Sequence, residues 1–342
     1  MTEEASGTAR TDLICVGDIS VDLYLTLNGD AISLEATDGG RTLALPFGAK
    51  IPCDVTTTVA AGGNSANVAV AGARLGLQVA LAAGVGVDQP GRDALDALRL
   101  EGVDVALVRI DPTAPTNRNF VLRVDHERTI LVHHEDHEAH WPDLWSSGVP
   151  AWLFLSSVGR DAHNYEAEIS RWLEEFPQVS FAFEPGTLQI ARGVAPVAPL
   201  YRRADLVICN RQEAATITGG AAQDSPVALL DRMLALGPSL VVITDGAAGA
   251  YGSDGRRHMA VPAFPNDGPV ADRTGAGDAF AATLVASMVS GLPLEDAMTR
   301  AAINSMRVVQ QVGSQAGLLR QGEMELLVAA APPSFAVCDL PA

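Results

Sequence analysis

Lysine is almost absent from this chain: among 342 residues the only lysine is Lys50. The Walker-type phosphate loop, GxxxxGK followed by Ser or Thr, does not occur, which excludes that way of holding a nucleoside triphosphate. Positive charge is scarce in general, and the net charge is −18. This charge argues against nucleic acid or an anionic membrane as a partner. It leaves room for a phosphorylated ligand, because backbone amides and a few arginines can form a local positive site.

Long apolar runs and paired cysteines are also missing. No apolar run reaches the length of a membrane span, and residues 1–12 lack the apolar region of a secretory signal. We therefore expect a cytoplasmic protein with loose tails at residues 1–11 and 331–342. The cysteines form no CxxC pair, and Cys15 and Cys209 lie in apolar runs, so reduced thiols are expected.

The second half of the chain alternates between strand-like and helix-like segments. Apolar runs that begin at Trp152, Val179, Asp205 and Leu240 are separated by helical stretches such as 166–176 and 226–236. Repeated strand-then-helix order predicts a mostly parallel sheet with helices on both faces. The apolar run at 12–18 reads as one more buried strand.

Two segments depart from this rhythm and read as β-rich excursions from the main domain. Residues 23–60 carry short β-rich runs without a helical period, and residues 113–135 read as a hairpin around 125–127. The cluster that follows, 133–140, holds four histidines and three carboxylates. Its spacing matches no established metal signature, which favours an exposed acidic loop, but a metal site stays open as an alternative.

Polar residues follow several of the predicted strands, at the edge where open α/β sheets bind ligands. Asp18 and Asp22 follow the first strand and are candidate hydroxyl binders, with turn aspartates as the alternative. Asn210 and Glu213 follow another, where a helix-capping pair is the alternative. Thr244 and Gly246 follow a third.

Two glycine motifs each precede a helix. In the first, Gly62 and Gly63 come before a small-residue helix, with Asn64 or Ser65 as its expected N-cap and Asn67 in its first turn. The spacing is not GxGxxG, so a Rossmann dinucleotide site is disfavoured.

The second motif, DRTGAGDAF at 272–280, delivers Asp278 to the start of an apolar helix. Amides at a helix start can hold an anion, and a carboxylate beside them can take a proton from an alcohol. An ordinary Asp-capped helix start is the alternative.

With both motifs in view, the chain resembles the ribokinase (PfkB) family of carbohydrate and nucleoside kinases. GGNSANVA at 62–69 and DRTGAGDAF at 272–280 look like the two family signatures, and the NxxE of Asn210 and Glu213 lies between them in family order. The similarity covers roughly residues 12–323. Asn64 stands where ribokinase itself carries a lysine, which weakens the case for ribose, and Thr283 replaces a usual Gly or Ala.

The resemblance implies a three-layer αβα sandwich with a mostly parallel central sheet and a small β-sheet lid. The kinase domain would span 12–330, with lid segments at about 23–60 and 113–135 inserted in it. In the family the lid closes over the sugar and often forms a homodimer contact. A small-molecule sugar or nucleoside, ATP and Mg²⁺ are the implied ligands, and K⁺ is implied as an activator.

Roles carry over by matching position. Asp278 would be the general base, and the amides of Gly275, Ala276 and Gly277 would be the anion hole. Arg273 would neutralise γ-phosphate charge, with a solvent-facing side chain as the alternative. Sugar hydroxyls would be held by Asp18, Asp22, Gly62, Gly63 and Asn67. Nucleotide contacts would come from Asn210, Glu213, Thr244, Gly246 and Asn304. Glu213 would organise Mg²⁺ through water, and Asp272, Thr274 and Gly313 match part of a K⁺ loop.

The leading hypothesis is an ATP-dependent kinase that phosphorylates a hydroxymethyl group of a sugar. A nucleoside kinase of the same family and a non-catalytic sugar- or nucleotide-sensing protein on the same fold remain as alternatives. The scarcity of aromatic residues in the lid segments favours a sugar over a nucleoside, and the intact Asp278 and NxxE argue against a pure sensor.

Overall fold

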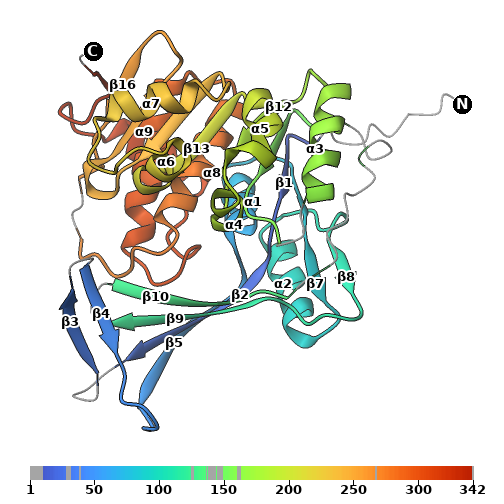
Figure 1. The fold of residues 1–342 in the computed structure, drawn as a ribbon, viewed down its shortest axis with the longest axis vertical. Helices are drawn as coiled ribbons and strands as arrows, with labels where there is room; N and C mark the ends of the chain where they lie inside the picture. The colour runs from blue at the N-terminus through green and yellow to red at the C-terminus, as the bar shows by residue number, and fades with distance from the viewer. Residues whose placement is uncertain are drawn as a thin grey trace, which may run out of the picture.

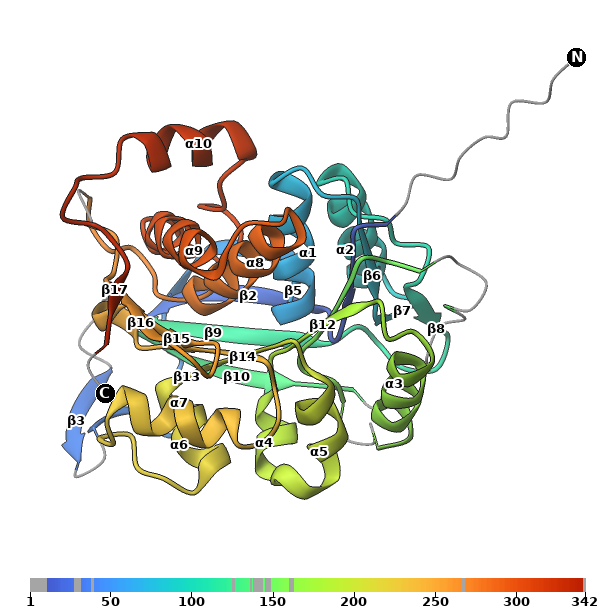
Figure 2. The same cartoon turned by 90° about the horizontal axis from the view of Figure 1, so that it is seen from above.

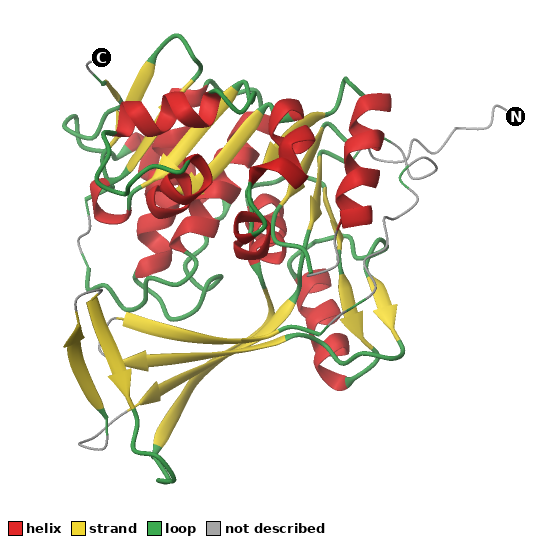
Figure 3. Ribbon diagram, in the orientation of Figure 1, coloured by secondary structure: helices red, strands yellow, loops and turns green. Residues whose placement is uncertain are grey.

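The computed structural model describes residues 11–27, 32–37, 40–124, 127–135, 137, 144, 149–159, 163–265 and 268–340. It contains a nine-stranded main sheet and a smaller four-stranded sheet, both yellow in Figure 3. None of the described helices is long and apolar enough to cross a membrane.

The main sheet is parallel from β6 to β14 and antiparallel beyond β14. Its short parallel strands are buried apolar runs, as expected for a sheet covered on both faces. In spatial order its strands are β17 (Cys338–Asp339), β16 (His258–Val261), β15 (Ala250–Ser253), β14 (Leu240–Thr244), β13 (Leu206–Asn210), β12 (Ser180–Phe183), β11 (Trp152–Leu155), β1 (Leu13–Val16) and β6 (Val79–Ala82).

Helices cover both faces of the main sheet (Figure 2). Each face has its own cluster of buried apolar side chains. One face carries α1 (Asn64–Arg74), α2 (Gln89–Leu100), α8 (Ala276–Val289), α9 (Leu294–Val309) and α10 (Gln321–Ala329). The other carries α3 (His163–Glu175), α4 (Thr187–Ala191), α5 (Val194–Arg203), α6 (Arg211–Thr218) and α7 (Pro226–Leu234). The predicted three-layer α/β fold with a mostly parallel sheet is confirmed.

The smaller sheet extends below the main body in Figure 1 and is built from both β-rich excursions. Its strands, in spatial order, are β10 (Glu127–His133), β9 (Arg118–Val124), β2 (Ser20–Leu27) and β5 (Cys53–Gly62). A separate hairpin of β3 (Ser33–Thr37) and β4 (Gly40–Ala44) lies beside it, and β7 (Gly84–Gly86) pairs with β8 (Arg109–Asp111).

Two of the places where the chain passes between the two sheets carry predicted site residues. β1 leads into β2 through Gly17 and Asp18, and β5 leads directly into α1 through Gly62 and Gly63. Because β1 pairs with β6 on one side and β11 on the other, the strand order reverses at β1. Open α/β sheets bind ligands at such a topological switch point.

The start of α1 differs from the expectation that Asn64 or Ser65 caps it. The N-cap is Gly63, whose φ of 97° lies in the region that favours glycine. A side chain there would place its Cβ 2.5 Å from the carbonyl oxygen of Asp18. Ser65 instead donates a hydrogen bond from Oγ to the carbonyl of Val16, at 2.7 Å. The close approach of the two backbones at this turn therefore requires glycine at position 63.

The C-terminal segment also differs from the expected loose tail at 331–342, of which the structure describes residues up to 340. Strand β17 extends the main sheet by pairing with β16. Phe335 is 7% exposed, and its ring packs edge-on against Phe264 at 4.8 Å between centroids. Composition alone gave no helical or strand period here, and the docking depends on two aromatic rings far apart in the sequence.

We expect Phe335→Ala to lower the free energy of unfolding by about 2–4 kcal/mol, because it removes a buried aromatic ring and leaves a cavity. Urea denaturation followed by circular dichroism measures this loss. Leu326→Ala is the matched control, since Leu326 is 72% exposed. An equal, small loss in both variants would mean that the C-terminal segment does not contribute to the fold.

Candidate active site

Asp278 lies in the first turn of α8 and is held by a residue from the other end of the chain. Asn67, on α1, donates a hydrogen bond from Nδ2 to Asp278 Oδ2 at 2.6 Å. Burial raises the pKa of Asp278, while the Asn67 hydrogen bond and the charge of Arg128 lower it. The N-cap of α8 is Gly275 rather than Asp278, so the carboxylate is not used to cap its own helix.

The amide of Asn67 is itself fixed by two partners from the loop after α9. Asn67 Oδ1 accepts from Ser314 Oγ at 3.0 Å and from Gln315 Nε2 at 2.9 Å. Asn67 is 3% exposed. All of these contacts orient Nδ2 toward Asp278, so Asn67 is a partner of the carboxylate in the structure, and its contact with the sugar stays a prediction.

The start of α8 forms a tight turn beside Asp278. Gly275 has a φ of 79°, and a Cβ there would lie 2.5 Å from the Cα of Ser314. A Cβ on Gly277 would meet nothing within 4 Å, so the space above this residue is open. The first amides of a helix lack intrahelical acceptors. The residues Gly275, Ala276 and Gly277 are thus brought together at one helix start, which is the geometry predicted for an anion cradle.

Asp22 lies on β2, facing the same region. It is 7% exposed, and its Oδ1 accepts from Ser20 Oγ at 2.7 Å and Asn119 Nδ2 at 2.9 Å. Burial raises its pKa from 3.8 to about 6, opposed by these hydrogen bonds and assisted by the charge of Asp278. A Cβ on Gly62 would lie 2.3 Å from Asp22 Oδ2, so a side chain at this position would displace the Asp22 carboxylate.

Asp18 follows β1 at the topological switch point of the main sheet. Burial raises its pKa from 3.8 to about 7. Its Oδ2 lies 3.8 Å from His134 Nδ1, and its backbone amide donates to the carbonyl of Ser157 after β11. Asp18, Asp22, Gly62 and Gly63 therefore surround one region, as predicted.

Asn210 and Glu213 form the capping box that was the alternative interpretation of this pair. Glu213 Oε2 accepts from the Asn210 amide at 2.8 Å, and Asn210 Oδ1 accepts from the Glu213 amide at 2.9 Å. Burial raises the pKa of Glu213, and the charge of Asp278 adds to it. The pair thus caps α6 and also places a carboxylate within the field of Asp278.

Glu184, at the end of β12, completes this group and was not among the predicted site residues. Burial raises its pKa well above the usual range, and the charges of Asp278 and Glu213 raise it further. Ser156, at the end of β11, donates to Glu184 Oε2 at 3.3 Å. The rule that polar residues at strand ends line the site could have found Glu184.

Thr244 and Gly246 lie at the end of β14, next to β13, the strand that ends in Asn210.

Two other predicted residues, Asn304 and Arg273, are not brought to the site. Asn304 is fully buried, donating from Nδ2 to Thr283 Oγ1 at 2.7 Å and accepting from the Leu319 amide at 3.0 Å. Its amide is thus part of the packing between α8, α9 and the following loop.

Arg273 lies at the surface and pairs with a carboxylate of β10. Its Nη1 lies 2.9 Å from Glu127 Oε1, and both side chains are more than half exposed. The charge that reaches Asp278 comes instead from Arg128, the next residue along β10. Sequence reasoning could not distinguish these arginines, because orientation across the two sheets is not encoded in the motif.

Asp272, Thr274 and Gly313 lie together, as predicted. Asp272 Oδ1 accepts from the Thr274 amide at 3.0 Å and from Thr274 Oγ1 at 2.8 Å. Asp272 Oδ2 accepts from the Gly313 amide at 3.3 Å. Arg123, on β9, also reaches this carboxylate, with Nε 4.0 Å from Oδ2.

The described part of the 133–140 cluster is spread over different surroundings. His133 contacts Glu135 at the surface, His134 approaches Asp18, and His137 lies 3.5 Å from Asp111. Residues 136 and 138–140 lie outside the described residues. Among the residues that are described, no group of three or more His, Cys, Asp or Glu is placed to hold a metal.

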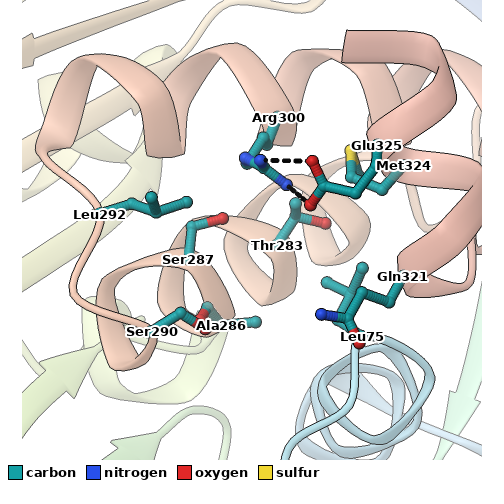
Figure 4. A pocket seen from close by; sticks show the side chains of 10 residues that line it. All are labelled: Leu75, Thr283, Ala286, Ser287, Ser290, Leu292, Arg300, Gln321, Met324 and Glu325. Atoms are coloured by element: carbon teal, nitrogen blue, oxygen red, sulfur yellow. Dashed lines mark hydrogen bonds and ion pairs between the residues drawn. The ribbon is translucent and has the colours of Figure 1, made fainter. Parts of the chain in front are cut away.

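A pocket of about 180 Å³ lies elsewhere, between α8, α9, α10 and the end of α1 (Figure 4). Arg300 closes one side of it through two hydrogen bonds to Glu325, at 2.7 and 2.9 Å. Its lining includes none of the predicted site residues. We attribute it to incomplete packing between helices.

Both the sequence and the fold of this chain are similar to those of known proteins. A family model described as pfkB family carbohydrate kinase matches residues 11–152 and 190–321. Ribokinase of Bacillus subtilis (strain 168) is 28% identical over 320 residues, covering 92% of this chain and 99% of the relative. The 2-dehydro-3-deoxygluconokinase of Thermoproteus tenax is 30% identical over 293 residues, covering 78% and 85%.

Among solved structures, Arabidopsis thaliana ribokinase complexed with ribose and ATP aligns with a TM-score of 0.75 and 20% identity, covering 93% of this chain and 99% of that one. A putative ribokinase II in complex with ATP and Mg²⁺ from E. coli aligns with a TM-score of 0.76 and 17% identity, covering 94% and 99%. At these identities the structures bear on the fold. The resemblance noted in the sequence is confirmed.

The buried carboxylates predict a dependence of stability on pH. Because Asp18 binds its proton more tightly in the folded state, the free energy of unfolding should fall as pH rises from about 4 to about 7. In Asp18→Asn this fall should shrink by about 2–4 kcal/mol. Urea denaturation at a series of pH values measures it. Asp96→Asn, at a side chain 73% exposed, is the control, and equal pH slopes in both variants would contradict the prediction.

Proposed function

The chain belongs to the pfkB family of carbohydrate kinases, and on that premise we propose that it transfers the γ-phosphoryl group of ATP to a hydroxymethyl group of a neutral sugar. Membership of this family makes it a sugar kinase. The proposal concerns how its residues act and which class of sugar they accept.

The observation that supports this function best is the pairing of Asp278 with an anion cradle on one helix start. The carboxylate has a raised pKa, and the open space above Gly277 lies beside it. A base with its pKa closer to neutral takes a proton from an alcohol more readily than an ordinary aspartate. In our proposal Asp278 takes the hydroxyl proton as the oxygen attacks the γ-phosphorus, and the amides of Gly275, Ala276 and Gly277 stabilise the phosphoryl charge.

Asn67 is proposed to position the base. Its hydrogen bond fixes Asp278 Oδ2, and Ser314 and Gln315 fix Asn67 in turn. Such positioning matters because catalysis of phosphoryl transfer consists mainly of alignment and charge stabilisation.

The residues present fit an incoming Mg²⁺·ATP complex. Mg²⁺ in kinases keeps several waters and binds through one or two carboxylates together with the phosphates of the nucleotide. Glu213 and Glu184 supply such carboxylates at adjoining strand ends, with Glu213 acting through water. When bound, the ion would neutralise charge on the triphosphate. Asn210, Thr244 and Gly246 are proposed to contact the nucleotide.

Charge at the sugar end of the site favours a neutral substrate. Asp18 and Asp22 lie there, each beside one glycine of the first motif, and Asn119 donates a hydrogen bond to Asp22. Carboxylates and amide oxygens suit the hydroxyl groups of a sugar, whereas the carboxylate of a sugar acid would be repelled by like charges. We therefore propose a neutral pentose or hexose, with Asp18, Asp22, Gly62 and Gly63 forming its binding surface.

The smaller sheet is proposed to act as the lid and to form a homodimer contact. Its edge strand β10 exposes Ile130, Leu131 and Val132, which are 39–62% exposed. An exposed apolar edge strand is prone to pair with another chain. The docked C-terminal segment extends the proposed kinase domain from 12–330 to residue 340, with lid segments at 23–60 and 113–135. Cytoplasmic residence stays a prediction.

An ADP-release assay with a panel of neutral pentoses and hexoses, sugar acids and nucleosides tests the proposal. Turnover with one neutral sugar supports it. Preference for a sugar acid would overturn the charge argument, and preference for a nucleoside would favour the nucleoside kinase alternative. Binding of sugars without turnover across the panel would favour a sensing protein.

We expect Asp278→Asn to lower kcat by a factor of about 10²–10⁴ while the dissociation constant of Mg²⁺·ADP stays nearly unchanged, because only proton removal is lost. Steady-state kinetics and isothermal titration calorimetry measure the two quantities. Asp93→Asn, an exposed aspartate on α2, serves as the control. Normal turnover by Asp278→Asn would exclude it as the base.

A further inference from the structure

Arg123 is a buried cation of the smaller sheet that reaches the loop before the anion cradle. It lies on β9, is 9% exposed, and donates from Nη2 to the carbonyl of Ala271 at 2.6 Å. Its Nε lies 4.0 Å from Asp272 Oδ2, and its Nη1 lies 3.4 Å from Thr26 Oγ1. Ala271 and Asp272 directly precede the turn that ends in Gly275.

Asp272 is 2% exposed and needs a compensating charge. Its hydrogen bonds from Thr274 and Gly313 are neutral, since their donors are amides and a hydroxyl. The guanidinium of Arg123 is the cation that faces it in the described structure. An arginine stays protonated at any working pH, so this compensation is permanent.

The residues around Asp272 do not fit the K⁺ ion that the family resemblance implies. A monovalent cation would need carboxylate and carbonyl oxygens of this loop as ligands. Here one carbonyl, that of Ala271, accepts from Arg123, and both oxygens of Asp272 already accept hydrogen bonds. A second positive charge beside a buried guanidinium would also be repelled strongly in such surroundings.

We propose that Arg123 takes the place of the monovalent cation, so that this kinase binds its nucleotide and works without K⁺. The guanidinium supplies the positive charge to the loop, and its bond to Ala271 holds the backbone that leads into Gly275. Arg123 acts through the loop and is a positioning residue. The inference rests on the proposed function, because it takes residues 275–277 as the phosphate-binding turn.

Binding of Mg²⁺·ADP, measured by calorimetry, tests the proposal without knowledge of the sugar. Titrations are run in KCl and in tetramethylammonium chloride at equal ionic strength, so that general screening is constant. For the natural chain we expect Kd to differ by less than about twofold between the salts. A gain in affinity of more than about tenfold in KCl would overturn the proposal.

The variant Arg123→Ala should create the dependence that the natural chain lacks. In tetramethylammonium chloride its Kd for Mg²⁺·ADP should rise by about tenfold, and KCl should restore most of that loss. A loss that KCl does not restore would show that Arg123 has only a structural role. Arg41→Ala, at an exposed arginine of β4, is the matched control and should respond to neither salt.

Two further results distinguish failure of the cation inference from failure of the proposed function. If Arg123→Ala does not fold, the comparison of salts on the natural chain still decides whether K⁺ is used. A chain that binds Mg²⁺·ADP equally in both salts but shows no turnover in the sugar panel would leave the cation inference standing and overturn the proposed function.

Discussion

Crowding of carboxylates at the carboxyl edge of the main sheet is the constraint around which the rest of the site is arranged. Burial raises the pKa values of Asp18, Asp22, Glu184, Glu213 and Asp278, and three of these groups feel the charge of Asp278. Buried charge without partners destabilises a fold. Neutral donors such as Asn67 and Ser20 donate hydrogen bonds to these carboxylates. The remaining negative charge would be neutralised by an incoming Mg²⁺·nucleotide complex. The same buried carboxylates therefore lower the stability of the fold and supply the negative charge that the proposed function uses.

Two arginines that reach this region come from the smaller sheet. Arg128 of β10 acts on Asp278, and Arg123 of β9 acts on the loop before Gly275. Positive charge thus depends on how the smaller sheet docks against the main body. In a chain with a net charge of −18 and one lysine, these two arginines supply positive charge at defined positions rather than through a general basic surface.

Sequence reasoning predicted the elements and the strand-end residues, because apolar periodicity and polar residues after strands reflect local rules. It could not predict which side chains meet across the fold. The hydrogen bond from Asn67, an expected sugar ligand, to Asp278 was not predicted, and Asn304 was expected near the nucleotide but bonds Thr283. Arg273 was expected at the phosphate and pairs with Glu127. Each difference arises from orientation between distant segments. The docking of Phe335 on Phe264 is of the same kind.

The hydrogen bond between Asn67 and Asp278 joins residues 211 positions apart, and Ser314 lies 247 positions from Asn67. Contacts of such high sequence separation form late, because their loop-closure entropy must be overcome first. A chain in which either end is still unfolded can expose the glycine turn, but it cannot align the carboxylate beside it. Nascent, truncated or partly unfolded molecules would therefore spend no ATP, and the appearance of catalytic activity during refolding reports completion of the whole topology.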